Sequence, residues 1–214
     1  MIPTSSSYQN IKKKYLKFLK SQEVLSEPFR DKMGQFENFY FPLSKKIYKT
    51  YIRDKKTKII GLTGGQGSGK STISQILKII LKEGFNLNTA IFSIDDFYKT
   101  QKERNIMSKK VSPLFSTRGV PGTHDTVLLK KCLKSLKKKN FNKISIPRFD
   151  KSIDERLPKK KWYNINKKQD IVIFEGWCVG VDSQKNKDLI LPINELEKVR
   201  DKKRIWRNTV NQEI

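Results

Sequence analysis

The sequence predicts an α/β protein in three layers, with a mostly parallel sheet and a helical extension at its N-terminus. After residue 57, short runs rich in β-branched residues alternate with amphipathic helical segments, a pattern that indicates parallel strands joined by helices. One run, residues 171–174, is apolar throughout, as expected of a strand that is covered on both faces. Helices on both faces of the sheet account for the three layers.

Residues 1–57 are interpreted as a basic helical extension and residues 58–214 as the α/β domain. The extension holds 13 Lys or Arg and 5 acidic residues. Two of its segments place apolar residues at helical spacing, namely Ile11, Tyr15, Phe18 and Leu19, and then Ile47, Tyr48, Tyr51 and Ile52. We expect these faces to pack on the core, and stacking of nucleic-acid bases on the aromatic rings is the alternative.

The strands of the α/β domain are expected at residues 58–62, 90–94 and 171–174. The helix after the first strand carries one apolar stripe, made of Ile73, Ile76, Leu77, Ile80 and Leu81. We expect this helix to end at Gly84, because glycine readily takes the left-handed conformation that closes a helix. A later helix begins near Asp125, with leucines facing inward and lysines facing solvent.

The chain is strongly basic, with 46 Lys or Arg against 21 Asp or Glu and a net charge of +25. A polyanionic partner such as nucleic acid requires that charge to be concentrated in a patch. Here the basic residues recur along the whole chain, so we interpret them as solvated lysine faces. Nucleic acid is therefore not the expected partner.

The two cysteines, Cys132 and Cys178, do not form a C-x-x-C pair. They support neither a disulfide framework nor a cysteine zinc site, and a reducing cytoplasm is the default location. Residues 1–20 lack the apolar run of a secretory signal, and no stretch approaches the ~20 apolar residues that cross a bilayer. We expect a soluble, cytoplasmic protein without a membrane partner.

Residues 64–71, Gly-Gly-Gln-Gly-Ser-Gly-Lys-Ser, match the phosphate-loop pattern G-x-x-x-x-G-K-[ST] between a predicted strand and a predicted helix. Glycines let backbone N–H groups wrap a phosphate. Lys70 can reach the β and γ phosphates of ATP, and the Ser71 hydroxyl can bind Mg²⁺. We therefore predict ATP and Mg²⁺ as cofactors. The predicted nucleotide-binding residues are Gly64, Gly65, Gln66, Gly67, Ser68, Gly69, Lys70, Ser71 and Thr72.

Asp95 and Asp96 follow the second predicted strand directly. We expect both carboxylates at the carboxyl edge of the sheet, on the same rim as the phosphate loop. A carboxylate there can orient the hydroxyl of a phosphoryl acceptor and take its proton. Capping of a turn or helix is the alternative role, and the nearby phosphate loop favours catalysis. This combination is typical of a small-molecule kinase that moves the terminal phosphoryl group of ATP to a hydroxyl.

Glu175 ends the third predicted strand and gives the same rim another carboxylate. A glutamate that follows an apolar strand is unusual, because an unpaired buried charge is costly. We expect it to help hold Mg²⁺, with a structural ion pair as the alternative.

Residues 118–125 form a loop dense in glycine, proline and polar groups, which contains the single histidine of the chain, His124. Arg118 and Arg148 are candidate anion clamps, because a guanidinium can hold a carboxylate or phosphate through two parallel hydrogen bonds. Asp125 can instead be the N-cap of the lysine-rich helix. For His124, a structural hydrogen bond and a substrate contact are equally favoured.

Several segments resemble the P-loop D-glycerate 3-kinases of plants, cyanobacteria and fungi, relatives of phosphoribulokinase, uridine kinase and pantothenate kinase. They are Thr-Arg-Gly-Val-Pro-Gly-Thr-His-Asp at 117–125, Pro-Arg-Phe-Asp-Lys at 147–151, Glu-Gly-Trp-Cys-Val-Gly at 175–180, Leu-Pro-Ile-Asn at 191–194 and Trp-Arg at 206–207. The strand followed by Asp-Asp-Phe-Tyr at 95–98 is shared in outline with the wider kinase group. With it, the resemblance extends over about residues 58–211.

This resemblance implies ATP- and Mg²⁺-dependent phosphorylation of D-glycerate to 3-phosphoglycerate. By motif position, Lys70 and Ser71 serve the nucleotide and the metal, Asp95 is the general base, and Glu175 is the Walker B equivalent. The catalytic set is thus Asp95, Lys70 and Glu175, and the metal ligands are Ser71 and Glu175. The expected substrate contacts are Tyr98, Arg118, His124 and Arg148.

The resemblance ends early, because family members continue beyond the Trp-Arg segment whereas this sequence stops at Ile214. In the family those further parts complete the lid and the adenine side, and lid closure is a large part of phosphoryl transfer. Three functions stay open: an active kinase, a nucleotide-binding remnant without turnover, and a P-loop ATPase acting on nucleic acid. A companion C-terminal polypeptide is a candidate partner.

Overall fold

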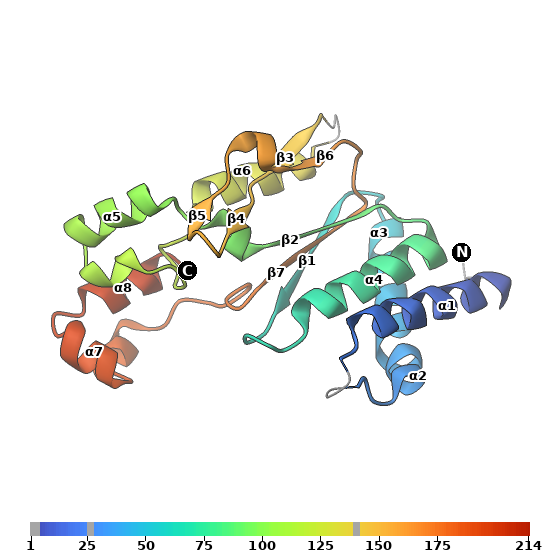
Figure 1. The fold of residues 1–214 in the computed structure, drawn as a ribbon, viewed down its shortest axis with the longest axis horizontal. Coiled ribbons are helices and arrows are strands. Elements are labelled where there is room, and N and C mark those ends of the chain that lie inside the picture. Colours follow the sequence, from blue (N-terminus) through green and yellow to red (C-terminus); the bar gives the residue numbers. More distant parts are fainter. Residues whose placement is uncertain (1–4, 25–27, 139–141) are drawn as a thin grey trace. The chain divides into compact units, whose positions relative to one another are not determined.

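The computed structural model describes residues 5–24, 28–138 and 142–214 (Figure 1). Residues 1–4 and 25–27 of the expected extension lie outside this part of the chain. The chain forms two compact units. Unit 1 comprises Met1–Phe92, Leu136–Asn142 and Asn166–Glu175, and unit 2 comprises Ser93–Ser135, Lys143–Ile165 and Gly176–Ile214. The expected domain boundary at residue 57 stays a prediction.

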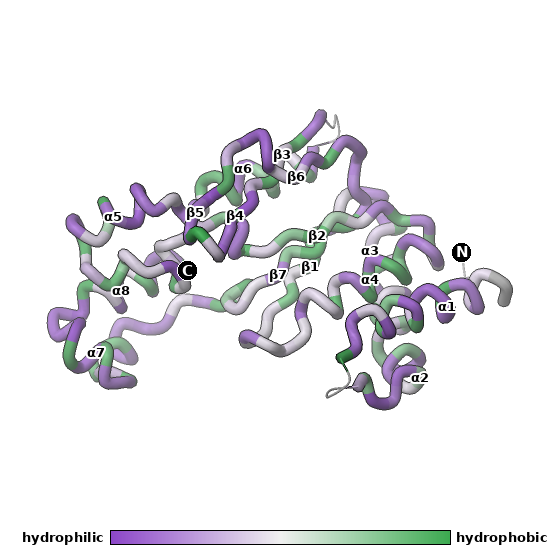
Figure 2. Tube along the Cα trace, in the orientation of Figure 1, coloured by the Kyte–Doolittle hydropathy of each residue, from purple (hydrophilic) through white to green (hydrophobic). Residues whose placement is uncertain are grey.

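A parallel three-stranded sheet lies in unit 1, in the order β1-β7-β2. Its strands are β1 (Lys58–Thr63), β7 (Ile171–Gly176) and β2 (Thr89–Ser93), each within two residues of the expected range. The central strand β7 is buried along its whole length, as its uninterrupted apolar run predicted. Figure 2 shows the apolar colour along β1 and β2. The predicted α/β class is confirmed.

Helix α4 (Lys70–Phe85) follows the phosphate loop and packs three residues of its predicted apolar stripe, Ile73, Leu77 and Leu81, against the sheet. The expected end at Gly84 is wrong. The helix continues to Phe85, and Asn86 takes the left-handed conformation at φ 52°. Asparagine tolerates this conformation, and the additional residue lets Phe85 stack on Tyr48 with ring centroids 4.6 Å apart.

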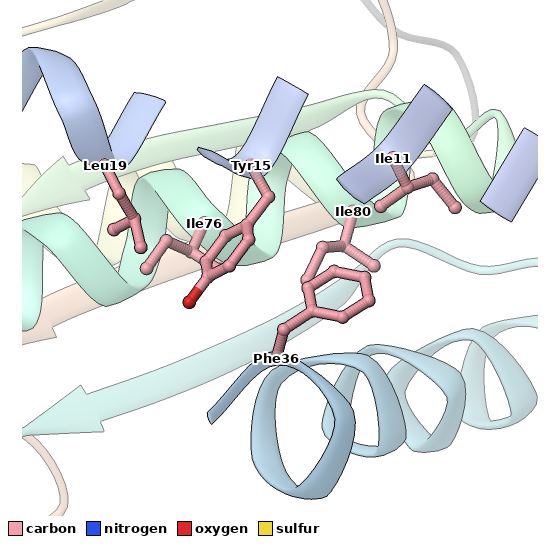
Figure 3. Close-up of a cluster of buried hydrophobic side chains, with 6 residues drawn as sticks. All are labelled: Ile11, Tyr15, Leu19, Phe36, Ile76 and Ile80. Atoms are coloured by element: carbon pink, nitrogen blue, oxygen red, sulfur yellow. The ribbon is translucent and has the colours of Figure 1, made fainter. Parts of the chain in front are cut away.

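The N-terminal extension consists of α1 (Ser5–Gln22), α2 (Lys32–Gln35), a π-helical turn (Phe36–Tyr40) and α3 (Phe41–Ile52). It packs on the other side of α4. A fully or nearly fully buried cluster joins them, made of Ile11, Tyr15, Leu19, Phe36, Ile76 and Ile80 (Figure 3).

Tyr15 is a core residue of this extension. Its hydroxyl donates to the Lys32 carbonyl at 2.8 Å, and burial raises its pKa to about 12. The ring is fully buried, so it has no face available for stacking on a base. The expectation that this aromatic residue packs in the core is confirmed.

Helix α3 is joined to the start of the central strand by Tyr51 and Asp170. The Tyr51 hydroxyl donates to Asp170 Oδ1 at 2.5 Å, and burial together with this carboxylate raises the Tyr51 pKa to about 12. Asp170 Oδ2 accepts from the backbone N–H of Asn88 at 2.8 Å. One carboxylate therefore links the extension, the turn before β2 and the turn before β7.

Unit 2 holds short helices and two small antiparallel strand pairs that the sequence did not predict. The pairs are β3 (Ile144–Ile146) with β6 (Tyr163–Ile165) and the hairpin of β4 (Phe149–Asp150) with β5 (Glu155–Arg156). The helical elements are η2 (Ile94–Phe97), α5 (Gln101–Lys110), η3 (Pro113–Ser116), α6 (Thr126–Leu136), η4 (Lys159–Lys161), η5 (Asn186–Leu189), α7 (Glu195–Arg200) and α8 (Ile205–Gln212). No helix in the described ranges is both long and apolar enough to cross a bilayer.

The lysine-rich helix α6 begins directly after Asp125, which takes the N-cap role given above as its alternative. The Asp125 carboxylate accepts the backbone N–H of Leu128 at 2.9 Å, which is an N-cap contact. Leu129 and Leu136 are buried, while the lysines at 130, 131 and 134 are exposed. The solvated lysine face is confirmed for this helix.

A buried ionic cluster joins α7 to α8 and explains the Trp-Arg segment of the tail. Arg207 is 5% exposed and lies 3.2 Å from Glu197 and 3.1 Å from Asp201. Asp201 also accepts the backbone N–H groups of Trp206 and Arg207. A buried guanidinium requires this pairing, because an unpaired buried charge is strongly destabilising.

Replacement of Ile80 by alanine tests whether the extension contributes to the stability of the α4 layer. Ile80 of α4 is fully buried against α1, and Ile80→Ala should lower the free energy of unfolding by about 2–5 kcal/mol. Urea denaturation measures the change. The control Ile52→Ala, at a position 42% exposed, should change it by roughly 0.5 kcal/mol or less. Equal effects of the two variants would contradict the packing described here.

Candidate active site

The phosphate loop between β1 and α4 has a backbone that requires glycine. Gly67 and Gly69 adopt φ values of 77° and 79°, where other residues are strained. A Cβ atom on Gly64 would lie 2.6 Å from the Ser68 hydroxyl oxygen. That hydroxyl donates to the Gly65 carbonyl at 2.8 Å, which closes the turn. Local geometry therefore explains Gly64, Gly67 and Gly69 of the motif.

Lys70 begins α4 and folds over this loop. Its ammonium donates to the Gly65 carbonyl at 2.6 Å, so it lies against the backbone that would wrap a phosphate. The remaining predicted nucleotide residues, Gln66 and Thr72, lie at the exposed loop tip and in the first turn of α4. The loop and the helix N-terminus thus offer N–H groups and a cation to an anion.

Ser71 and Glu175 meet, as the metal-site prediction requires. The exposed Ser71 hydroxyl donates to Glu175 Oε1 at 2.8 Å. Glu175 ends β7 and is 8% exposed. Its other oxygen, Oε2, accepts from the buried Ser74 hydroxyl at 3.2 Å. Sequence reasoning missed Ser74, although its position one helical turn after Ser71 was a usable signal.

The chemistry of this pair fits Mg²⁺. The ion prefers oxygen ligands, commonly one or two protein groups with nucleotide phosphates and water in the other positions. Ser71 and Glu175 supply a hydroxyl and a carboxylate, and the described ranges contain no cluster of three or more His, Cys, Asp or Glu that would form an all-protein cage. When bound with a nucleotide, the ion would neutralise charge on the phosphates.

In unit 2, Asp95 lies in η2, which directly follows β2. Two donors hold its carboxylate. The Lys151 ammonium lies 2.7 Å from Oδ2, and the Tyr98 hydroxyl makes a side-chain hydrogen bond to it. Burial, reinforced by the Asp95 charge, raises the pKa of Tyr98 far above its usual value, so the phenol stays protonated and donates. Sequence reasoning gave Lys151 no role.

Asp96 has a structural position instead. It forms a capping box with Ser93, whose backbone N–H lies 3.3 Å from Asp96 Oδ2. It also accepts the backbone N–H of Phe149, and Arg148 Nε lies 3.7 Å away. Burial raises the pKa of Asp96, although these partners act in the opposite direction. The capping alternative describes Asp96, which leaves Asp95 as the candidate base.

His124 is almost fully buried, at 2% exposed, and its ring stacks on Tyr98 with centroids 4.3 Å apart. Burial lowers its pKa to about 4, so the imidazole is neutral near pH 7. In the described ranges Nε2 has no hydrogen-bond partner. One ring nitrogen is thus buried without a partner in that part of the chain, and the ring supports Tyr98.

The two candidate clamp arginines differ in availability. Arg118 forms a close ion pair with Asp154, which also pairs with the fully buried Arg104 at 2.5 Å. Both guanidinium groups lie over the Phe149 ring, at 5.6 and 5.7 Å. The Arg148 side chain is 56% exposed, with Asp96 at 3.7 Å. Arg148 is therefore more accessible to an acceptor anion than Arg118.

Unit 2 brings the distant motif segments together. The indole N–H of Trp177 donates to the Gly119 carbonyl at 2.9 Å, which joins the 175–180 and 117–125 segments. Arg156 donates to the Tyr98 carbonyl through Nε at 2.9 Å and Nη2 at 2.8 Å, and it lies 3.2 Å from Asp125. Sequence reasoning missed Arg156, because nothing in its local pattern indicates a distant carbonyl partner.

A glycine-rich loop between a strand and a helix, with a buried acid on the neighbouring strand, defines a P-loop nucleotide-binding protein. Comparison with family models agrees, since the model of the "Phosphoribulokinase / Uridine kinase family" matches residues 59–212. The chain belongs to this family of P-loop kinases.

Individual relatives carry kinase names. An uncharacterized kinase, mug58, of Schizosaccharomyces pombe is 39% identical over 131 residues, covering 58% of this chain and 47% of the relative. A uridine kinase of Clostridium novyi is 31% identical, covering 70% and 67%. A solved structure of D-glycerate 3-kinase from Cryptococcus neoformans is similar with a TM-score of 0.62 and 27% identity, covering 81% and 65%. The chain spans about half the length of the S. pombe kinase.

Binding of Mg-ATP should stabilise the protein, and Lys70→Ala should remove most of the effect. At a hundredfold excess over Kd, a ligand that binds only the folded state adds about 2.7 kcal/mol. Thermal melts with and without saturating Mg-ATP measure it. The control Lys82→Ala, at an exposed position near the other end of α4, should retain the wild-type shift. A wild-type melt unchanged by millimolar Mg-ATP would argue against an intact loop.

Proposed function

We propose that the chain is an ATP-dependent kinase whose acceptor is a small hydroxy acid, with D-glycerate as the first candidate and 3-phosphoglycerate as the product. The observation that carries this proposal is the environment of Asp95. A carboxylate directly after β2 is held by a lysine and a buried tyrosine, and a largely exposed arginine lies beside the adjoining Asp96. A base and an anion-binding group in one segment suit an acceptor with both a hydroxyl and a carboxylate.

The proposed chemistry is an in-line phosphoryl transfer. The loop amides and Lys70 hold the ATP phosphates, and Asp95 takes the proton of the acceptor hydroxyl. The acceptor oxygen forms a bond to the γ-phosphorus while the bond from this phosphorus to the β–γ bridging oxygen breaks, so that ADP leaves. Ser71 and Glu175 would hold the Mg²⁺ that accompanies the nucleotide.

Recognition of the acceptor would rest on Arg148, with His124 in support. A guanidinium pairs with a carboxylate through two parallel hydrogen bonds, which selects a planar anion by geometry. Burial lowers the pKa of His124 to about 4. Above that pH the imidazole is neutral, so it would offer a hydrogen bond without adding charge. The segments resembling D-glycerate 3-kinases, and the similar solved structure that carries that name, support glycerate as the acceptor.

A nucleotide-binding remnant without turnover is the alternative. Such a protein would bind Mg-ATP at the phosphate loop and transfer no phosphoryl group to an acceptor. We propose the cytoplasm as the location in either case.

A screen of acceptors with labelled ATP tests the function. D-glycerate should be phosphorylated faster than uridine, pantothenate, ribulose 5-phosphate or glycerol, which lacks the carboxylate. Faster labelling of one of the other four would remove the glycerate assignment and keep the kinase. Binding of Mg-ATP without labelling of any acceptor would favour the remnant. ATP hydrolysis stimulated by polynucleotide in a salt-sensitive manner would instead indicate the nucleic-acid ATPase.

Substitution of the two neighbouring carboxylates should separate their roles. Asp95→Asn should lower kcat by ~10²- to 10⁴-fold with little change in the KM for ATP, because it removes the proton acceptor. Asp96→Asn should mainly lower stability, by about 1 kcal/mol, because it weakens a capping box. Steady-state kinetics and urea denaturation of both variants measure these effects. A near-normal kcat for Asp95→Asn would assign the base elsewhere.

The two arginines can be distinguished by lysine substitutions that keep the charge and remove the fork. Arg148→Lys should raise the KM for D-glycerate at least tenfold more than the KM for ATP, since losing a bidentate contact is worth about 1.4 kcal/mol or more. Arg118→Lys should chiefly lower stability, because Asp154 and the buried Arg104 depend on its pairing. The opposite outcome, with Arg118→Lys changing only the KM for glycerate, would make Arg118 the clamp.

A further inference from the structure

The buried carboxylate of Glu175 is held by two hydroxyls of the same helix. Oε1 accepts from Ser71 at 2.8 Å and Oε2 accepts from Ser74 at 3.2 Å. Ser71 is exposed at the start of α4, whereas Ser74 is fully buried one turn further along. Each carboxylate oxygen therefore has a donor, and the two donors differ in their access to solvent.

This difference assigns different roles to the two serines. Ser71, next to the phosphate loop, can turn its oxygen to a cation. Ser74 is enclosed and can only orient the carboxylate. Ligating carboxylates are commonly held by such outer hydrogen bonds, which fix their orientation and stabilise their charge.

We infer that Ser74 is a positioning residue, which keeps Glu175 in place for the divalent cation that accompanies the nucleotide. The inference rests on the proposed binding of Mg-ATP, and it does not depend on the acceptor.

The local alternatives for a helical serine strengthen this assignment. A serine within a helix commonly returns its hydroxyl to a backbone carbonyl one turn earlier. The Ser74 hydroxyl donates instead to a residue 101 positions later in the chain. A buried carboxylate that loses one of two donors is less well solvated, and its free oxygen can rotate away from the metal position.

A Mg²⁺ titration tests the role without any acceptor present. ATP is held at a fixed concentration, Mg²⁺ is varied, and the thermal shift is recorded for wild type, Ser74→Ala and Ser44→Ala. Ser44 is the matched control, since it is another fully buried serine of unit 1, in α3, whose hydroxyl has no hydrogen-bond partner in the described ranges. Ser74→Ala should need about tenfold more Mg²⁺ for half of the shift. Ser44→Ala should match wild type.

A double-mutant cycle with Glu175→Gln identifies the path of the effect. If Ser74 acts through Glu175, Ser74→Ala should add little to the Mg²⁺ requirement of Glu175→Gln. Equal tenfold effects in both backgrounds, or a Ser74→Ala titration that matches Ser44→Ala, would overturn the inference. If Ser74→Ala does not fold, Ser74→Cys replaces it, because cysteine keeps the volume and is a weak donor. Ser74→Cys should need more Mg²⁺ than wild type for half of the shift, by less than tenfold. A Mg²⁺ requirement equal to that of wild type would overturn the inference.

The titration also separates this inference from the acceptor assignment. Failure to phosphorylate D-glycerate in the acceptor screen would remove the acceptor and leave the Mg²⁺ result standing. Conversely, active transfer to glycerate together with an unchanged Mg²⁺ requirement in Ser74→Ala would remove the role of Ser74 alone.

Discussion

Unit 1, which contains the phosphate loop, depends on one buried carboxylate, Glu175, at the end of the central strand β7. Burying a charge is unfavourable unless it is paired or hydrogen-bonded, and here two α4 hydroxyls satisfy it. The same contacts fix the register between β7 and the helix that follows the phosphate loop. The hydrogen bonds that stabilise the buried charge thus also place the Glu175 carboxylate beside the Ser71 hydroxyl. These two oxygen groups are suited to Mg²⁺.

The helix that carries these hydroxyls is supported along its other side by the N-terminal extension. Ile76 and Ile80 lie in one cluster with α1 and the π-helical turn, while Leu77 and Leu81 lie in another with β7. A helix with apolar residues on two adjoining faces is buried between two layers. The extension is therefore part of the layer that keeps the loop helix on the sheet.

In unit 2, contacts of buried or half-buried arginines join segments that are distant in the sequence. Asp154 pairs with Arg104 and Arg118 around the Phe149 ring, and Arg156 donates to the carbonyl of Tyr98. These contacts hold the short hairpin of β4 and β5, which is too small to be stable alone. The segment that holds Asp95 is thereby attached to the loop that contains His124.

The sequence by itself determined the α/β class, the three strands and the phosphate loop, because hydrophobic periodicity and glycine conformation are local properties. It did not determine which of Asp95 and Asp96 is the cap, which arginine is accessible, or that α4 passes Gly84 so that Phe85 stacks on Tyr48. Tertiary structure decided these points, as it decided the partners of Ser74 and Lys151. Their partners lie 101 and 56 positions away, and contacts at that separation depend on how the strands and hairpins are arranged in space.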